Sequence, residues 1–173
     1  MNETIKTLLN RRSVRAYTEK MPSDADLALI IEAGRYAPTG MNAQNTMAVV
    51  IKNKEIRDRV SKMNAAVMGS DKDPFYGAPA VVVVFADTAR YTYIEDGSLC
   101  IGNMLNAAHS LGISSCWIHR AGQVFDSPEG RELARSWGVP DSYKGIGNVI
   151  LGYADGPEPQ TKPRKDGFEI IVE

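Results

Sequence analysis

The sequence has little net charge, few cysteines and histidines, and no long apolar run. It contains 173 residues, of which 20 are basic and 21 are acidic, for a net charge of −1. A protein that binds nucleic acid needs a basic face that displaces counterions from phosphates, so this balance argues against such a partner. The longest strongly apolar run spans residues 78–86, which is too short to cross a bilayer and is typical of a buried strand. We therefore expect neither nucleic acid nor a membrane as a partner.

The few cysteines and histidines offer little for metal binding or disulfide formation. Cys100 and Cys116 lie in segments with a buried pattern, and no metal-ligand spacing surrounds them. We interpret them as free core thiols, with a disulfide or a reactive pair as the alternative. The first ten residues lack the basic start and apolar run of a signal peptide, which favours a cytoplasmic protein. No metal site is expected.

The residues that are present predict one α+β domain over residues 1–173. Hydrophobic residues make up 43% of the chain, enough for a normal core. Apolar spacing and capping signals predict helices near 3–10, 23–36, 53–66, 92–111 and 128–137, and strands near 47–52, 80–86, 115–120 and 147–153. The helix near 53–66 carries many charges and is expected to face solvent. The strand near 80–86 is apolar throughout and is expected to be central.

Three arginines and a serine lie within five positions, at Arg11, Arg12, Ser13 and Arg15. Guanidinium groups are planar donors that match phosphate geometry, and a serine hydroxyl adds a neutral donor. Cations so close together repel one another unless an anion or carboxylates lie among them. The segment therefore indicates an anion site, with a solvated helix end or a phosphorylation-like basic site as the alternatives.

A polar loop runs from Pro38 to Gln44, between a predicted helix and a predicted strand. It offers the hydroxyl of Thr39, the backbone amide of Gly40 and the side-chain amides of Asn42 and Gln44. An amide side chain is both donor and acceptor, which suits the edge of a heterocycle with alternating N–H and C=O groups. An ordinary polar connection is the alternative.

Two later segments can add to such a site. The turn and strand at 112–119 can place the backbone of Ile118 and His119 along a planar ligand, although Trp117 is more typical of a core or interface aromatic. One isolated histidine does not define a catalytic base. Lys162 and Arg164 are two residues apart, so in an extended segment both point to the same side and can meet one anion. A solvated basic tail is the alternative.

Taken together, these segments resemble the signature of the nitroreductase family, flavin oxidoreductases that bind FMN. The resemblance covers essentially the whole chain. It rests on the RRSVR segment at 11–15, the loop PTGMNAQ at 38–44, the long helix and glycine-bounded turn into a Trp-Ile strand at 112–118, the Gly-Tyr strand end at 152–153 and the KPR segment at 162–164. Two departures stand out. Asn45-Thr46 replaces the usual Pro-Trp, and His119 replaces a small residue or glutamate.

The resemblance implies a central mixed β-sheet flanked by helices, and a homodimer in which the C-terminal segment adds to the partner's sheet. It also implies that the arginine segment and the basic tail hold the FMN phosphate, while the polar loop approaches the flavin from the partner subunit. The strand at 117–119 runs beside the ring, near its reactive N5. The implied cofactor-binding residues are Arg11, Arg12, Ser13, Arg15, Pro38, Thr39, Gly40, Asn42, Gln44, Trp117, Ile118, His119, Lys162 and Arg164.

The implied activity is that of an FMN-dependent oxidoreductase. It takes hydride from NADH or NADPH and reduces a small-molecule acceptor, such as a nitroaromatic, a quinone or an activated alkene, by a ping-pong mechanism. Because the cofactor carries the difficult chemistry, we name no catalytic side chain. The alternatives are a relative with another flavin reaction (reductive dehalogenation or substrate oxidation), a non-catalytic flavin-binding or redox-sensing protein, and an anion-binding domain without flavin.

Overall fold

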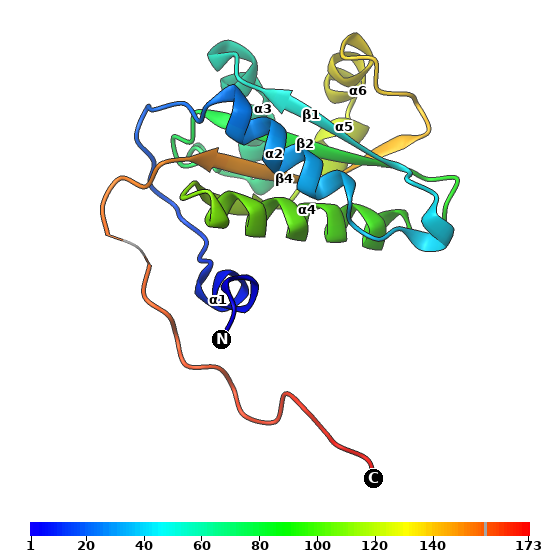
Figure 1. Cartoon of the computed structure of the whole chain (residues 1–173). Helices are drawn as coiled ribbons and strands as arrows, with labels where there is room; N and C mark the ends of the chain where they lie inside the picture. Colours follow the sequence, from blue (N-terminus) through cyan, green and yellow to red (C-terminus); the bar gives the residue numbers. More distant parts are fainter. Residues whose placement is uncertain (158) are drawn as a thin grey trace.

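The computed structural model describes residues 1–157 and 159–173, and its helices and strands follow the predicted order (Figure 1). The helices are α1 (Glu3–Asn10), α2 (Asp24–Arg35), α3 (Lys54–Met68), α4 (Tyr93–Ser110), α5 (Ala121–Asp126) and α6 (Pro128–Ser136). The strands are β1 (Thr46–Ile51), β2 (Ala80–Asp87), β3 (Ser114–Ile118) and β4 (Tyr143–Gly152). A single 3-10 turn, Gly40–Asn42, precedes β1. The α+β class is confirmed.

The strands form one antiparallel sheet in the order β1-β2-β4-β3. β2 and β4 are the inner strands, and residues 80–86 of β2 are all buried, as expected for an apolar run. The expectation of a mixed sheet is corrected: within the described residues, the only parallel pairing is an isolated bridge between Ser13 and Ser115. Apolar patterns show which residues face a core, but they carry no information on the direction in which strands pair.

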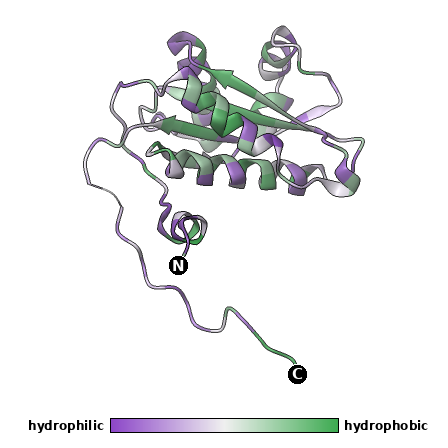
Figure 2. Ribbon diagram, in the orientation of Figure 1, coloured by the Kyte–Doolittle hydropathy of each residue, from purple (hydrophilic) through white to green (hydrophobic). Residues whose placement is uncertain are grey.

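Helices cover both faces of the sheet (Figure 1). Alternate residues of β2 point to opposite faces, so Val82 packs with α2 and α4, whereas Val83 packs with α3, α5 and α6. Figure 2 shows the strands in the green of hydrophobic residues, as expected when both faces are covered. The two cysteines are free and buried, and they belong to different cores: Cys100 lies on the α4 face and Cys116 on the α3 face. The prediction of free core thiols is confirmed.

Three local predictions differ from the structure. The charged helix near 53–66 does not simply face solvent, because α3 buries the polar residues Arg57, Ser61 and Asn64. α5 was not predicted, since its six residues are too few to show helical periodicity. β4 begins at Tyr143, four residues before the predicted start. The first residues of this strand include Lys144 and Gly145, and both residue types are depleted in strands.

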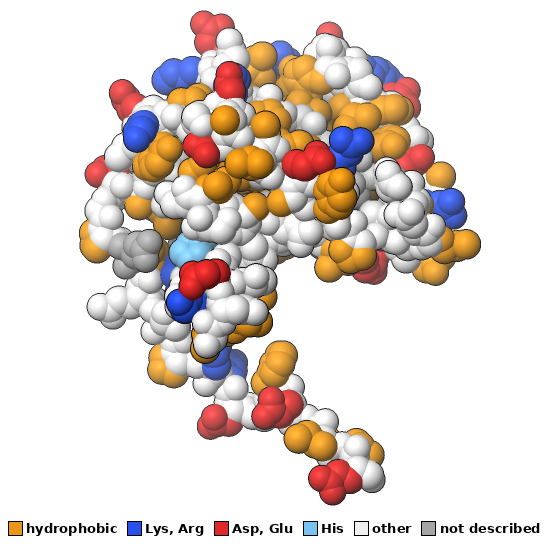
Figure 3. Space-filling view, in the orientation of Figure 1, with side chains coloured by type: hydrophobic (Ala, Val, Ile, Leu, Met, Phe, Trp, Pro, Cys, Tyr) orange, Lys and Arg blue, Asp and Glu red, His pale blue; other side chains and the backbone are white. Residues whose placement is uncertain are grey.

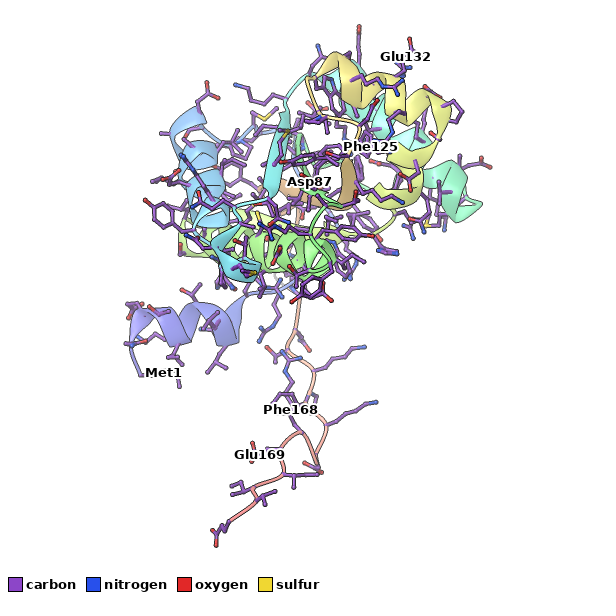
Figure 4. The ribbon with its side chains drawn as sticks, turned by 90° about the vertical axis from the view of Figure 1, so that its right-hand side faces the viewer. Met1, Asp87, Phe125, Glu132, Phe168 and Glu169 are labelled. Atoms are coloured by element: carbon purple, nitrogen blue, oxygen red, sulfur yellow. The ribbon has the colours of Figure 1, made fainter. Side chains whose placement is uncertain are left out.

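Two parts of the chain stand apart from the body. α1 has no buried residue, and Ile5, Leu8 and Leu9 on its apolar face are 42–54% exposed. The C-terminal tail extends away from the sheet, and Figure 3 shows its hydrophobic side chains in orange, clear of the main surface. Phe168, labelled in Figure 4, is 96% exposed. No helix among the described residues is long and apolar enough to span a membrane.

Candidate functional site

The arginine segment, residues 11–15, lies along the outer edge of β3. Ser13 pairs in parallel with Ser115, and the Val14 N–H donates to the Ser115 carbonyl over 3.1 Å. Val14 and Tyr17 are buried, and the Tyr17 hydroxyl donates to the Val14 carbonyl over 3.0 Å. Burial raises the pKa of Tyr17 above its ordinary value, so the hydroxyl stays protonated and keeps this hydrogen bond. The pairing fixes the backbone of residues 13–14 against the sheet.

The parallel direction of this pairing orders the arginines along the strand. Arg11 precedes the bridge and lies toward the start of β3, where α4 ends, whereas Arg15 follows the bridge and lies toward the end of β3. Arg15 is exposed, and its guanidinium makes only a long contact of 3.5 Å with the Ser13 carbonyl. The strand edge therefore carries Arg11 and Arg12 near one end and Arg15 near the other.

A small cavity of about 120 Å³ lies between the arginine segment and the turn that connects α4 to β3. The Nη1 atom of Arg11 is buried and has no hydrogen-bond partner among the described residues, and the same is true of the Oγ atom of Ser115. A buried donor without a partner carries the full cost of desolvation, which is larger when the donor is charged. The cavity is thus bordered by two residues, one cationic and one with a hydroxyl, that each hold a buried polar atom without a partner among the described residues. It is lined by Asn10, Arg11, Arg12, Val14, His109, Gly112, Ile113, Ser114, Ser115 and Pro159.

Arg12 connects this end of the strand to the C-terminal tail. Its Nε donates to the Thr161 hydroxyl over 2.9 Å, and Nη2 contacts the same oxygen. Nη1 donates to the carbonyls of Leu9 and Arg11, each over 2.7 Å. Thr161 directly precedes Lys162, so the basic tail begins beside the arginine segment. Lys162 and Arg164 are exposed.

The predicted ring-facing residues lie at the far end of β3. Ile118 is buried, whereas Trp117 and His119 are exposed, and their rings meet edge to face with centroids 5.7 Å apart. Trp117 packs over Gly147, where an added Cβ would come within 2.2 Å of its Nε1. Arg120 follows in the left-handed region, with φ of 78°, which is unusual for a residue other than glycine.

The polar loop is ordered by contacts with the start of α4. The Gly40 N–H donates to Asp96 Oδ1 over 2.8 Å, and the Gln44 N–H donates to the Thr39 hydroxyl over 3.0 Å. A Cβ at Gly40 would come within 2.5 Å of the Thr92 hydroxyl, so this close approach requires glycine. Asn42 and Gln44 both have positive φ, near 54° and 50°, and both are exposed.

Within one subunit, the polar loop and the cavity of Arg11 lie at opposite ends of α4. The loop contacts Thr92 and Asp96 at the start of α4, whereas His109 at the end of the same helix lines the cavity of Arg11. α4 has 18 residues and is about 27 Å long. One subunit therefore brings together the arginine segment, the start of β3 and the start of the basic tail, but leaves Pro38–Gln44 at the other end of α4.

Sequence reasoning missed several residues of this region. Ser114, Ser115 and His109 line the cavity. Asn64 and Asn148 are buried beside the end of β3, where both donate to main-chain carbonyls. Only tertiary contacts reveal these roles, since no local spacing links the residues. Asn45, at one departure from the family pattern, is buried, and its side-chain amide has no partner among the described residues. Those residues contain no cluster of three or more metal-ligating side chains.

Comparison with known proteins shows the family of the chain. A model of the nitroreductase family matches residues 8–153. A crystal structure of a nitroreductase with bound FMN from Bacteroides fragilis superposes with a TM-score of 0.93, at 36% identity over 100% of both chains. An FMN reductase [NAD(P)H] from Bacillus subtilis is 33% identical over 88% of this chain and 66% of its own length. An iodotyrosine deiodinase from Thermotoga neapolitana is 24% identical over 94% of this chain and 92% of its own length. The chain belongs to the nitroreductase family.

Proposed function

We propose that the protein is an FMN-dependent oxidoreductase that uses NADH or NADPH to reduce small-molecule acceptors. The observation that carries this proposal is the buried Nη1 atom of Arg11, which has no partner among the described residues and belongs to a side chain that lines a polar cavity beside β3. An anion in that cavity would give this donor the partner that the described residues do not supply. FMN bound in the Bacteroides fragilis relative carries such an anion, its phosphate.

The residues present fit FMN along the β3 edge, with the phosphate at the start of the strand. Arg11 and the Ser115 hydroxyl would hold the phosphate from the body of the protein, and Lys162 and Arg164 from the tail that Arg12 anchors through Thr161. At the other end of β3, Arg15 would place positive charge at the pyrimidine edge of the ring. The backbone of Ile118 and His119 would lie beside the ring.

The proposed site is completed by a second copy of the chain. Thr39, Gly40 and Asn42 lie a helix length away from Arg11 in one subunit, so they would reach the flavin from the partner. Exposed apolar residues on α1, together with Leu99 of α4 at 48% exposure, are available for such an interface. The interface would bring the loop of each subunit to the β3 edge of the other.

The apolar tail has one free strand edge available for addition. The outer edge of β3 is partly covered by residues 13–14, whereas β1 pairs on one side only within the described residues. Beside β1, Leu27, Ala28 and Ile31 of α2 form an apolar groove together with Val50. We propose that residues 168–172 of the partner add to this edge. The four-stranded sheet would thereby gain a fifth strand.

Bound FMN would supply the redox chemistry, accepting hydride from the nicotinamide and passing electrons to the acceptor after the nicotinamide has left. The chain's own residues would bind and orient the cofactor, and no side chain is required as an acid or base. Nitroaromatics, quinones and activated alkenes are the proposed acceptors. The deiodinase relative favours reductive dehalogenation as the second candidate.

The absorption spectrum of the purified protein tests the proposal. We expect a flavin spectrum, release of FMN on denaturation at about one per subunit, and oxidation of NADH or NADPH when a quinone or nitroaromatic is added. Stoichiometric FAD, or no uptake of FMN by the apoprotein, would contradict the proposed cofactor. FMN without any nicotinamide oxidation would favour a flavin-binding protein, and turnover limited to a halogenated phenol would favour the dehalogenase.

A further inference from the structure

A buried asparagine holds the peptide that follows β3. Asn64 of α3 is 0% exposed, and its Nδ2 donates to the His119 carbonyl over 2.8 Å. Its Oδ1 accepts from Arg120 Nε over 3.0 Å, so one amide holds both the His119 carbonyl and the Arg120 side chain. Asn148 of β4 adds a longer bond of 3.4 Å to the same carbonyl and one of 3.2 Å to the Ile118 carbonyl.

These bonds fix the direction of the next N–H group. The described chain contains no cis peptide, and in a trans peptide the carbonyl and the N–H point in opposite directions. Because the His119 carbonyl points inward to Asn64, the Arg120 N–H points away from α3. No backbone or side-chain hydrogen bond among the described residues uses this N–H. A second sign of constraint is the left-handed backbone of Arg120, which a non-glycine residue adopts only when its surroundings impose it.

We propose that Asn64 is a positioning residue that aims the Arg120 N–H at the flavin ring and thereby shifts the affinity of the protein toward oxidised FMN. The inference rests on the proposed function, because it assumes that the ring lies beside the end of β3. N5 of an oxidised flavin is a hydrogen-bond acceptor, whereas N5 of a reduced flavin carries a hydrogen and cannot accept from the same donor. An N–H held in this direction therefore stabilises the oxidised form more than the reduced form.

The test compares Asn64→Leu with the matched control Asn103→Leu in the FMN-loaded protein. Asn64→Leu keeps a branched side chain of similar shape but removes both the donor to the His119 carbonyl and the acceptor for Arg120 Nε. Asn103 makes the same kind of bond elsewhere, from Nδ2 to the Ala33 carbonyl over 3.0 Å between α4 and α2. We expect Asn64→Leu to weaken oxidised FMN about tenfold and reduced FMN much less. The two-electron midpoint potential then rises by about 30 mV, the equivalent of tenfold.

The readouts are the dissociation constant for oxidised FMN and the midpoint potential measured against a reference dye. A structural role alone would weaken both oxidation states equally and leave the potential at the parental value, as we expect for Asn103→Leu. That result for Asn64→Leu would overturn the inference. If Asn64→Leu does not fold, Asn64→Ser is measured instead, since its shorter hydroxyl cannot span the same distance, and the same criterion applies. A parent protein that binds no FMN would overturn the proposed function itself.

Discussion

The guanidinium of Arg57, only 8% exposed, donates to the Asp73 carboxylate over 2.7 Å and ties α3 to the loop that precedes β2. Arg57 also donates to the Ala78 carbonyl over 3.0 Å. The Asp73 carboxylate in turn accepts from the backbone N–H groups of Phe75 and Gly77, over 2.9 and 2.8 Å. A single carboxylate thus fixes the turn between α3 and the central strand.

Asp73→Asn should lower the free energy of unfolding at neutral pH by about 1–3 kcal/mol, because a buried guanidinium loses one of its two anionic partners and keeps only Asp58. Burial alone would raise the pKa of Asp73, but hydrogen bonds from Arg57, Ser61 and the backbone outweigh it and hold the pKa below its ordinary value. A carboxylate with a lowered folded-state pKa contributes stability above its unfolded pKa of about 3.9, and this is lost as pH falls through the folded value.

Urea denaturation from pH 7 to pH 3 measures this difference. The difference in unfolding free energy between parent and variant should be constant near neutral pH. It should narrow below about pH 4, where Asp73 becomes protonated, first in the unfolded chain and then in the folded one. Asp71→Asn is the matched control, since Asp71 is exposed and two residues away, and it should leave the curve unchanged. If the difference in unfolding free energy stayed the same down to pH 3, the charge of Asp73 would contribute nothing to stability.

Arg11→Ala should weaken FMN binding about tenfold to a hundredfold, because it removes a charge-assisted hydrogen bond of roughly 1.5–3 kcal/mol to the phosphate. Riboflavin has no phosphate, so its affinity should barely change. Fluorescence-quenching titrations of the apoprotein measure both ligands. Arg35→Ala provides the control, since the Arg35 side chain is 75% exposed and pairs with Glu32 on the same helix. Equal losses for FMN and riboflavin would indicate a damaged fold rather than a lost phosphate contact.

Elements with strong local signals could be predicted from the sequence. α2 starts after Ser23, whose side chain accepts from the Asp26 N–H over 3.1 Å, and both residue types are typical of a helix start. β2 was recognisable from its unbroken apolar run, and its central place followed from burial on both faces. The arginine segment and the loop at 38–44 were recognisable as motifs because they are continuous in sequence.

The remaining features depend on tertiary contacts. Neither the antiparallel direction of the strands nor the cavity shared by Arg11 and Ser115 has a local signature, since the two residues are more than a hundred positions apart. Asn64 lies on a helix whose charges indicate solvent exposure, yet it is fully buried. Its bond to the His119 carbonyl forms because β3 ends beside α3. No spacing along the chain predicts that proximity.

Gly102→Ala should stabilise the isolated subunit but weaken the homodimer. An added Cβ at Gly102 would meet no atom within 4 Å in one subunit, and replacing a helical glycine with alanine contributes about 1 kcal/mol. If α4 packs closely against the partner at this position, the new methyl group forces the helices apart. Sedimentation at several concentrations measures the dimer constant, and thermal unfolding of the dilute subunit measures its stability. An unchanged dimer constant would place the interface away from Gly102, and Gly102→Leu would then be tolerated as well.

Deleting residues 166–173 while keeping Lys162 and Arg164 should weaken the dimer and FMN binding together. Phe168, Ile170, Ile171 and Val172 are 81–96% exposed in one subunit, and residues of this kind associate when a strand edge is available. Under the proposed arrangement, the loop at 38–44 would reach the flavin from the partner, so a subunit that loses its partner would also lose part of the site. Sedimentation read alongside flavin fluorescence measures both effects in the same samples. Glu173→Gln keeps the apolar tail and should behave as the parent. A truncated protein that is monomeric yet binds FMN at parental strength would separate dimerisation from flavin binding and contradict the two-subunit site.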